Sequence, residues 1–126
     1  LLSQCYTNLS PSKYFKDSPS PYQILDNGLK IFIEDDFYIV KGNGTGSMRP
    51  FSDGSYYISV KIKSLTDIEI GDIIHFNRAT DGRSITHRVI NLTNEGLITK
   101  GDNNAVQDDY LVKFEDIKGK AVGILW

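Results

Sequence analysis

Residues 56–62 (YYISVKI) place apolar side chains at every second position, with Ile58, Val60 and Ile62 alternating with other neighbours. This period of two predicts a β-strand. Similar strand-length runs occur on either side, at residues 29–33, 37–41, 72–76, 85–91, 97–100 and 120–125, whereas residues 65–72 are expected to be a loop and residues 112–117 a short strand or a single helical turn. Because no convincing amphipathic helix separates these runs, the sequence predicts an all-β fold, a small folded β-sheet or barrel.

The first 21 residues differ in character from the rest. Pro11, Pro19 and Pro21 lie among serines, and prolines spaced in this way disfavour a helix. We therefore expect an irregular N-terminal arm or linker over residues 1–21 and a single β domain over residues 22–126. A length of 126 residues suits one small domain.

Charge and cysteine content exclude several classes of function. The formal net charge is −2 and the lysines and arginines are scattered, so we expect no nucleic-acid partner. Cys5 is the only cysteine, which rules out an internal disulfide and a zinc site built from several thiolates. We expect no metal and no cofactor. The apolar runs are strand-length, well below the roughly 20 residues that cross a bilayer.

Three stretches supply polar side chains of complementary chemistry. They are residues 42–46 (GNGTG) followed by Ser47, residues 85–90 (ITHRVI) with His87, and residues 99–104 (TKGDNN) with Asp102, followed by Asp108. A serine hydroxyl is a weak nucleophile at neutral pH, so it needs a nearby base and a third group that orients the base. A histidine, mostly neutral at pH 7, can accept the proton. The pattern predicts a serine–histidine–aspartate site.

Five short motifs in order carry a family resemblance that spans about residues 38–125. They are residues 46–50 (GSMRP), 71–76 (GDIIHF), 85–90 (ITHRVI), 99–104 (TKGDNN) with Asp108 and Asp109, and 119–123 (GKAVG). The chain resembles type I signal peptidases of the archaeal and endoplasmic-reticulum branch. The resemblance implies the folded β-sheet or barrel that these enzymes share with SOS-repressor proteases. It also implies a serine endopeptidase that removes signal peptides from exported preproteins.

The resemblance assigns roles to individual residues. Ser47 would attack the scissile carbonyl and His87 would act as the base, where the bacterial branch uses a lysine. Asp108 is favoured as the residue that orients the histidine, with Asp102 in support, although either could do so. The backbone N–H of Ser47 and the hydroxyl of Thr45 are the candidate donors to the oxyanion.

The resemblance also implies partners and a location. The partners would be preprotein signal peptides, the membrane and, as a further candidate, the translocation machinery. The catalytic domain would lie on the extracytoplasmic or lumenal face. A membrane anchor would have to lie outside these residues, at either end.

Each residue also has a structural interpretation. Ser47 could be a turn residue, His87 a strand histidine, and the two aspartates Asx-turn residues. His75 is expected to be structural, Tyr57 a core or strand-face residue, and Arg88 a surface charge or an ion-pair partner.

Two rival functions remain open at the sequence level. One is a self-cleaving protease of the SOS-repressor kind, which needs a lysine base and usually a DNA-binding segment. The other is a non-catalytic module that holds a peptide on the same scaffold by strand addition.

Overall fold

The computed structural model describes residues 22–26, 28–31, 33, 36–42, 47–48 and 54–125. The strands within these ranges are β1 (Tyr22–Leu25), β2 (Gly28–Ile31), β3 (Phe37–Lys41), β4 (Tyr56–Val60), β5 (Ile73–Asn77), β6 (Ser84–Leu92), β7 (Leu97–Lys100) and β8 (Ile117–Leu125), with 3₁₀ turns η2 (Leu65–Asp67) and η3 (Phe114–Asp116). The predicted all-β fold is confirmed. The predicted arm over residues 1–21 lies outside the described residues, and the division into arm and domain stays a prediction.

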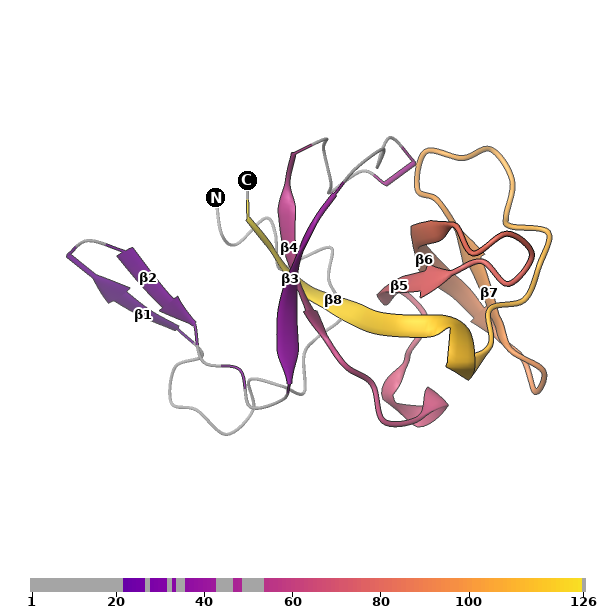
Figure 1. The fold of residues 1–126 in the computed structure, drawn as a ribbon, viewed down its shortest axis with the longest axis horizontal. Helices are drawn as coiled ribbons and strands as arrows, with labels where there is room; N and C mark the ends of the chain where they lie inside the picture. Colours follow the sequence, from indigo (N-terminus) through magenta and orange to yellow (C-terminus); the bar gives the residue numbers. More distant parts are fainter. Residues whose placement is uncertain are drawn as a thin grey trace.

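The strands form two antiparallel sheets. β1 and β2 pair with each other, while the main sheet has six strands in the order β3-β4-β8-β5-β6-β7. β8 is the long central strand of this sheet, drawn in yellow in Figure 1. Its second half pairs with β4 and its first half with β5, and Lys120 is paired on both sides, with Val60 and with Ile74. β8 therefore joins the two halves of the sheet.

Two irregularities in pairing bend β8. Between Gly123 and Ala121, Val122 has no counterpart on β4, and between Gly119 and Ile117, Lys118 has no counterpart on β5. An extra residue of this kind kinks its strand and increases the local twist. The sheet consequently folds over, and residues that follow β3 can approach β6, which lies on the far side of β8.

The apolar side chains fill both faces of the folded sheet. One cluster comprises Met48, Tyr57, Ile73, Ala121 and Ile124; a second comprises Ile68, Ile74, Phe76, Val89, Leu97 and Val112; a third comprises Ile58, Val60 and Val122. β4 contributes alternate residues to the first and third clusters, so it is buried on both faces, as a central strand requires. Burial of each large side chain stabilises the fold by about 1.5–3 kcal/mol.

Most predicted strands are confirmed, with some differences at their ends. β3 and β7 have the expected bounds, and of the two alternatives for residues 112–117 the single helical turn is found, as η3, with an isolated bridge at Val112 before it. The expected start of the last strand at residue 120 is wrong, because Ile117 already pairs with Phe76. The strand expected over residues 56–62 ends at Val60, and β1 was not expected.

No helix among the described residues has the length and apolar character needed to span a membrane.

Gly119 is required at the join between the two halves of the sheet. A Cβ atom there would lie 2.5 Å from both the Ser59 hydroxyl and the Tyr38 hydroxyl, and 2.8 Å from the backbone carbonyl of Val60. Gly119→Ala is therefore expected to lower the free energy of unfolding by about 1–3 kcal/mol, because the backbone must move to accept the methyl group. Thermal unfolding by circular dichroism measures the loss.

Gly123→Ala on the same strand is the matched control. Its Cβ would lie 3.3 Å from the Ile58 Cδ1 atom, the end of a flexible side chain, so its melting temperature should fall less. Equal losses for the two variants would contradict the account of the join.

Candidate active site

Ser47 is held from two sides, just after the segment that follows β3. The next residue, Met48, is 1% exposed and packs with Tyr57 and Ile73, which anchors the serine to the core. On the other side, the backbone N–H of Asn103 donates to the Ser47 carbonyl at 2.8 Å. The turn that contains Gly101 lies close to the serine, since a Cβ on Gly101 would be 2.8 Å from the Ser47 Cβ. The serine is thus fixed before any ligand binds.

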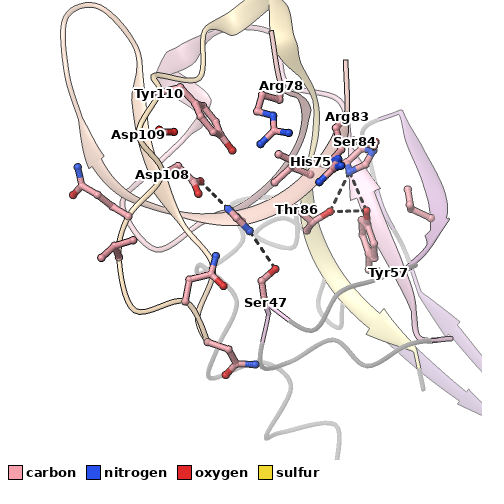
Figure 2. Close-up of a pocket in the computed structure, with 18 of the residues that line it drawn as sticks. Ser47, Tyr57, His75, Arg78, Arg83, Ser84, Thr86, Asp108, Asp109 and Tyr110 are labelled. Carbon is pink, nitrogen blue, oxygen red and sulfur yellow. Dashed lines mark hydrogen bonds and ion pairs between the residues drawn. The ribbon is translucent and has the colours of Figure 1, made fainter. Parts of the chain in front are cut away.

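His87 faces Ser47 from β6. Its Nε2 lies 3.2 Å from the Ser47 Oγ (Figure 2). The imidazole side chain is 9% exposed and packs edge-on against the ring of Phe76, with 6.5 Å between ring centroids. This packing restricts the imidazole to one orientation, in which it can exchange a proton with the serine hydroxyl.

Asp108 lies behind the histidine. Its Oδ2 accepts from the His87 Nδ1 at 2.7 Å and from the hydroxyl of Thr99 at 2.6 Å. The backbone N–H of Asp108 donates to the Thr99 carbonyl at 2.9 Å, so the strand end and the loop are locked together. A carboxylate on Nδ1 keeps the neutral imidazole in the tautomer whose Nε2 can accept a proton, and stabilises the imidazolium that results.

Asp102 makes a different contact. Its two carboxylate oxygens accept from the Arg88 guanidinium at 2.9 and 2.8 Å, and the same guanidinium donates to the Gly71 carbonyl at 2.8 Å. A two-point contact between planar groups fixes direction as well as distance. The pair therefore ties the loop that carries Asn103, and through it Ser47, to the strand that carries His87.

The structure brings together three of the predicted site residues, Ser47, His87 and Asp108, in one hydrogen-bonded line. Asp102 instead forms an ion pair with Arg88. Arg88 is half-buried, so of its two expected roles, a surface charge or an ion-pair partner, the structure shows the second. Thr45 lies outside the described residues. The role of Thr99 was not predicted, because no sequence pattern shows that its hydroxyl donates to a carboxylate nine residues on.

A cavity of about 1040 Å³ opens over this line of side chains. One wall consists of the loop over residues 103–110, and another contains a second hydrogen-bonded cluster, formed by Tyr57, His75 and Thr86 (Figure 2). His75 is thus part of the cavity wall and not only a strand residue. Burial lowers the pKa of His75, partly offset by a backbone hydrogen bond with Ile85.

The rim of the cavity carries charge and an aromatic ring. Arg78 forms an ion pair with Asp81, and its guanidinium lies over the ring of Tyr110 at 5.9 Å from the centroid. Burial, followed by the negative charge of Asp108, raises the pKa of Tyr110 to about 12. Tyr110 is therefore a neutral phenol at physiological pH.

The His75 shift can be checked by titration. Because burial disfavours the charged ring, its NMR titration midpoint should lie below the ordinary value of about 6.5. The unfolded chain therefore binds the proton of this histidine more tightly than the folded chain does. The contribution of the neutral ring to the free energy of unfolding is present above about pH 6.5 and is lost as the pH falls. The chain has two histidines, so a His75→Gln variant assigns the signals. A midpoint at or above 6.5 would contradict the effect of burial.

Gly101→Ala tests the fixed position of the serine. The added methyl group would lie 2.8 Å from the Ser47 Cβ and 2.7 Å from the Asn104 Nδ2, so the serine must move away. A displacement of about 1 Å can lower reactivity about 100-fold. The rate at which a fluorophosphonate probe labels Ser47 measures the effect, with circular dichroism to show that the variant is folded. An unchanged labelling rate would show that the position of Ser47 does not depend on its close contact with Gly101.

Comparison with known proteins gives two informative similarities. The chain is 33% identical over 91 residues to signal peptidase I W of Bacillus subtilis, across 68% of this chain and 47% of that protein. It is 32% identical over 94 residues to the signal peptidase complex catalytic subunit SEC11 of Chaetomium globosum, across 64% of this chain and 54% of that protein. No protein-family model matches the chain, and no solved structure matches it significantly. The chain spans about half the length of these relatives, and over that part the similarity supports a relationship to signal peptidases.

Proposed function

We propose that this chain is the catalytic part of a signal peptidase, a serine endopeptidase that removes signal peptides from exported preproteins through an acyl-enzyme. The observation that carries the proposal is the continuous line from the Ser47 hydroxyl through the His87 ring to the Asp108 carboxylate. This line opens onto a cavity large enough for several residues of a peptide. The similarity to two proteins named as signal peptidases supports the same reaction.

In the acylation step, the His87 Nε2 takes the proton of the Ser47 hydroxyl as its oxygen attacks the scissile carbonyl carbon. The Asp108 carboxylate holds the Nδ1 proton and stabilises the imidazolium that forms. The imidazolium then gives its Nε2 proton to the leaving amine, and the mature chain departs. The signal peptide stays attached to Ser47 as an ester.

In the deacylation step, His87 takes a proton from water, and the hydroxide attacks the ester carbonyl carbon. The proton returns to the Ser47 oxygen as the signal peptide leaves with a new carboxylate. Both tetrahedral intermediates need hydrogen-bond donors for the oxyanion, each worth about 2.7–4 kcal/mol. The backbone N–H of Ser47 and the hydroxyl of Thr45 are the candidates.

The cellular setting follows from the proposed reaction. A histidine as base fits the archaeal and endoplasmic-reticulum branch of the family. The substrates would carry small residues at positions −1 and −3 of the cleavage site. The domain would act on the extracytoplasmic or lumenal face of a membrane, with the translocation machinery nearby.

The two rival functions make different demands on the site. A self-cleaving protease of the SOS-repressor kind would need a lysine next to the serine, whereas the group 3.2 Å from the Ser47 hydroxyl is an imidazole. Specific self-cleavage of the purified protein would favour that rival. Peptide binding without any labelling by a serine probe would favour a non-catalytic module.

Substitution at the three residues tests the proposal. Ser47→Ala and His87→Ala should each lower kcat/KM for preprotein cleavage by at least about 10⁴-fold without unfolding the domain, because each removes one partner of the proton transfer. Asp108→Asn should cost less than Ser47→Ala, because Asp108 orients the base and does not itself react. A gel-based assay with a purified preprotein measures the rates.

Glu115→Gln is the matched control, since this exposed carboxylate lies in the turn η3, apart from the residues that line the cavity. It should leave cleavage within about twofold of the wild type. Near-wild-type turnover by either Ser47→Ala or His87→Ala would overturn the mechanism.

A further inference from the structure

The second cluster in the cavity has no part in the proton transfer described above. The Tyr57 hydroxyl lies 3.2 Å from the His75 Nδ1 and 3.1 Å from the Thr86 hydroxyl, which is itself 3.1 Å from the same nitrogen. The hydroxyl of Ser84 lies 3.2 Å from the other ring nitrogen. All four residues line the cavity that contains Ser47 and His87.

The cluster is built from three strands and is fixed in position. Tyr57 comes from β4, and its ring is 1% exposed in the core beside Met48, so only its hydroxyl reaches the cluster. His75 and Thr86 are direct cross-strand partners on β5 and β6. The geometry of these hydroxyl groups therefore does not have to be organised by a ligand, which lowers the entropic cost of binding.

Thr86 is the member best placed to meet a substrate. It is half-buried and lines the same cavity as Ser47 and His87, so a peptide that occupies this cavity with its scissile bond at Ser47 can reach it. Figure 2 shows its side chain between Ser47 and His75. A substrate side chain that reaches this part of the cavity would thus meet a hydroxyl group.

Thr86 retains hydrogen-bonding capacity after its contacts within the cluster. A threonine hydroxyl has one proton and two lone pairs. Burial lowers the pKa of His75, so the ring is neutral at pH 7, and the contacts to Tyr57 and His75 use two of these three positions. A third position remains for a group that enters the cavity.

We propose that Tyr57, His75 and Thr86 form a polar subsite that receives a small hydroxyl-bearing side chain, serine in preference to an alkyl side chain of the same size, from a substrate residue close before the cleaved bond. This inference rests on the proposed function and narrows its substrate class. Because the cluster is already hydrogen-bonded without a substrate, an alkyl side chain leaves no orphaned group behind. Serine is therefore preferred over the alkyl side chain by the free energy of one added hydrogen bond, which corresponds to a factor of about five. Serine is not strictly required.

Paired peptides test the subsite. Each pair spans a signal-peptide cleavage site and differs at one of the three residues before the cleaved bond, which is serine in one peptide and its isostere 2-aminobutyrate in the other. At one of these positions the wild-type protein should cleave the serine peptide about fivefold faster in kcat/KM. Thr86→Val, which removes the hydroxyl and keeps the shape, should bring that ratio to about one, and Tyr57→Phe should lower it.

Two variants act as matched controls. Tyr56→Phe removes a hydroxyl from the neighbouring, exposed residue of β4, and Thr80→Val makes the same change as Thr86→Val at an exposed turn. Both should keep the wild-type ratio. A ratio near one in the wild type, or a ratio that Thr86→Val leaves unchanged, would overturn the subsite while cleavage itself upheld the proposed function.

If the wild-type protein cleaved neither peptide of any pair, the proposed function would fail, and the subsite would still be tested by binding. Fluorescence anisotropy with labelled peptides and the Ser47→Ala protein should show about fivefold tighter binding of the serine peptide. Equal affinities, or no binding of either peptide, would overturn the subsite.

Discussion

The sharing of β8 between the two halves of the sheet is the constraint on which the rest of the structure depends. Lys120 pairs with β4 on one side and with β5 on the other, and the extra residues Lys118 and Val122 bend the strand on either side of it. Without this bend the segment after β3 and the strand β6 would lie four strands apart in a flat sheet. With it, Ser47 and His87 come within hydrogen-bonding distance.

The join is connected to the site by polar contacts. The Lys120 ammonium, 4% exposed, donates to Asp72 at 2.9 Å and to the Asp67 carbonyl at 2.8 Å. Asp72 in turn pairs through its backbone with Val89, next to the arginine that holds Asp102. Loss of one partner of a buried ion pair costs about 3–5 kcal/mol. One connected set of polar contacts therefore positions the serine, the histidine and the bend in β8. A short motif around the serine alone would not create a site.

The sequence predicted the parts of the fold that depend on local pattern. Residues 37–41 are rich in aromatic and β-branched residues, and residues 97–100 follow a predicted turn at residues 94–96; both strands have the predicted bounds. The predicted start of β8 was wrong because Lys118 and Gly119 break the apolar pattern, while the pairing of Ile117 and Gly119 depends on β5, more than forty residues earlier. For the site, the resemblance pointed to Ser47 and to the histidine and aspartates. The hydroxyl of Thr99 and the cluster around His75 depend on contacts between strands, which no single stretch of sequence shows.

The central claim is that Ser47 forms a covalent bond to the substrate after His87 takes its proton. Rapid acid quenching of the protein during turnover of a preprotein, followed by mass spectrometry of the proteolytic fragment that contains Ser47, tests it directly. The account predicts a fragment heavier by the mass of the signal peptide less one water, and its absence from His87→Ala protein. Either of two results would contradict it: steady turnover with Ser47 unmodified at every quench time, or an adduct on another residue.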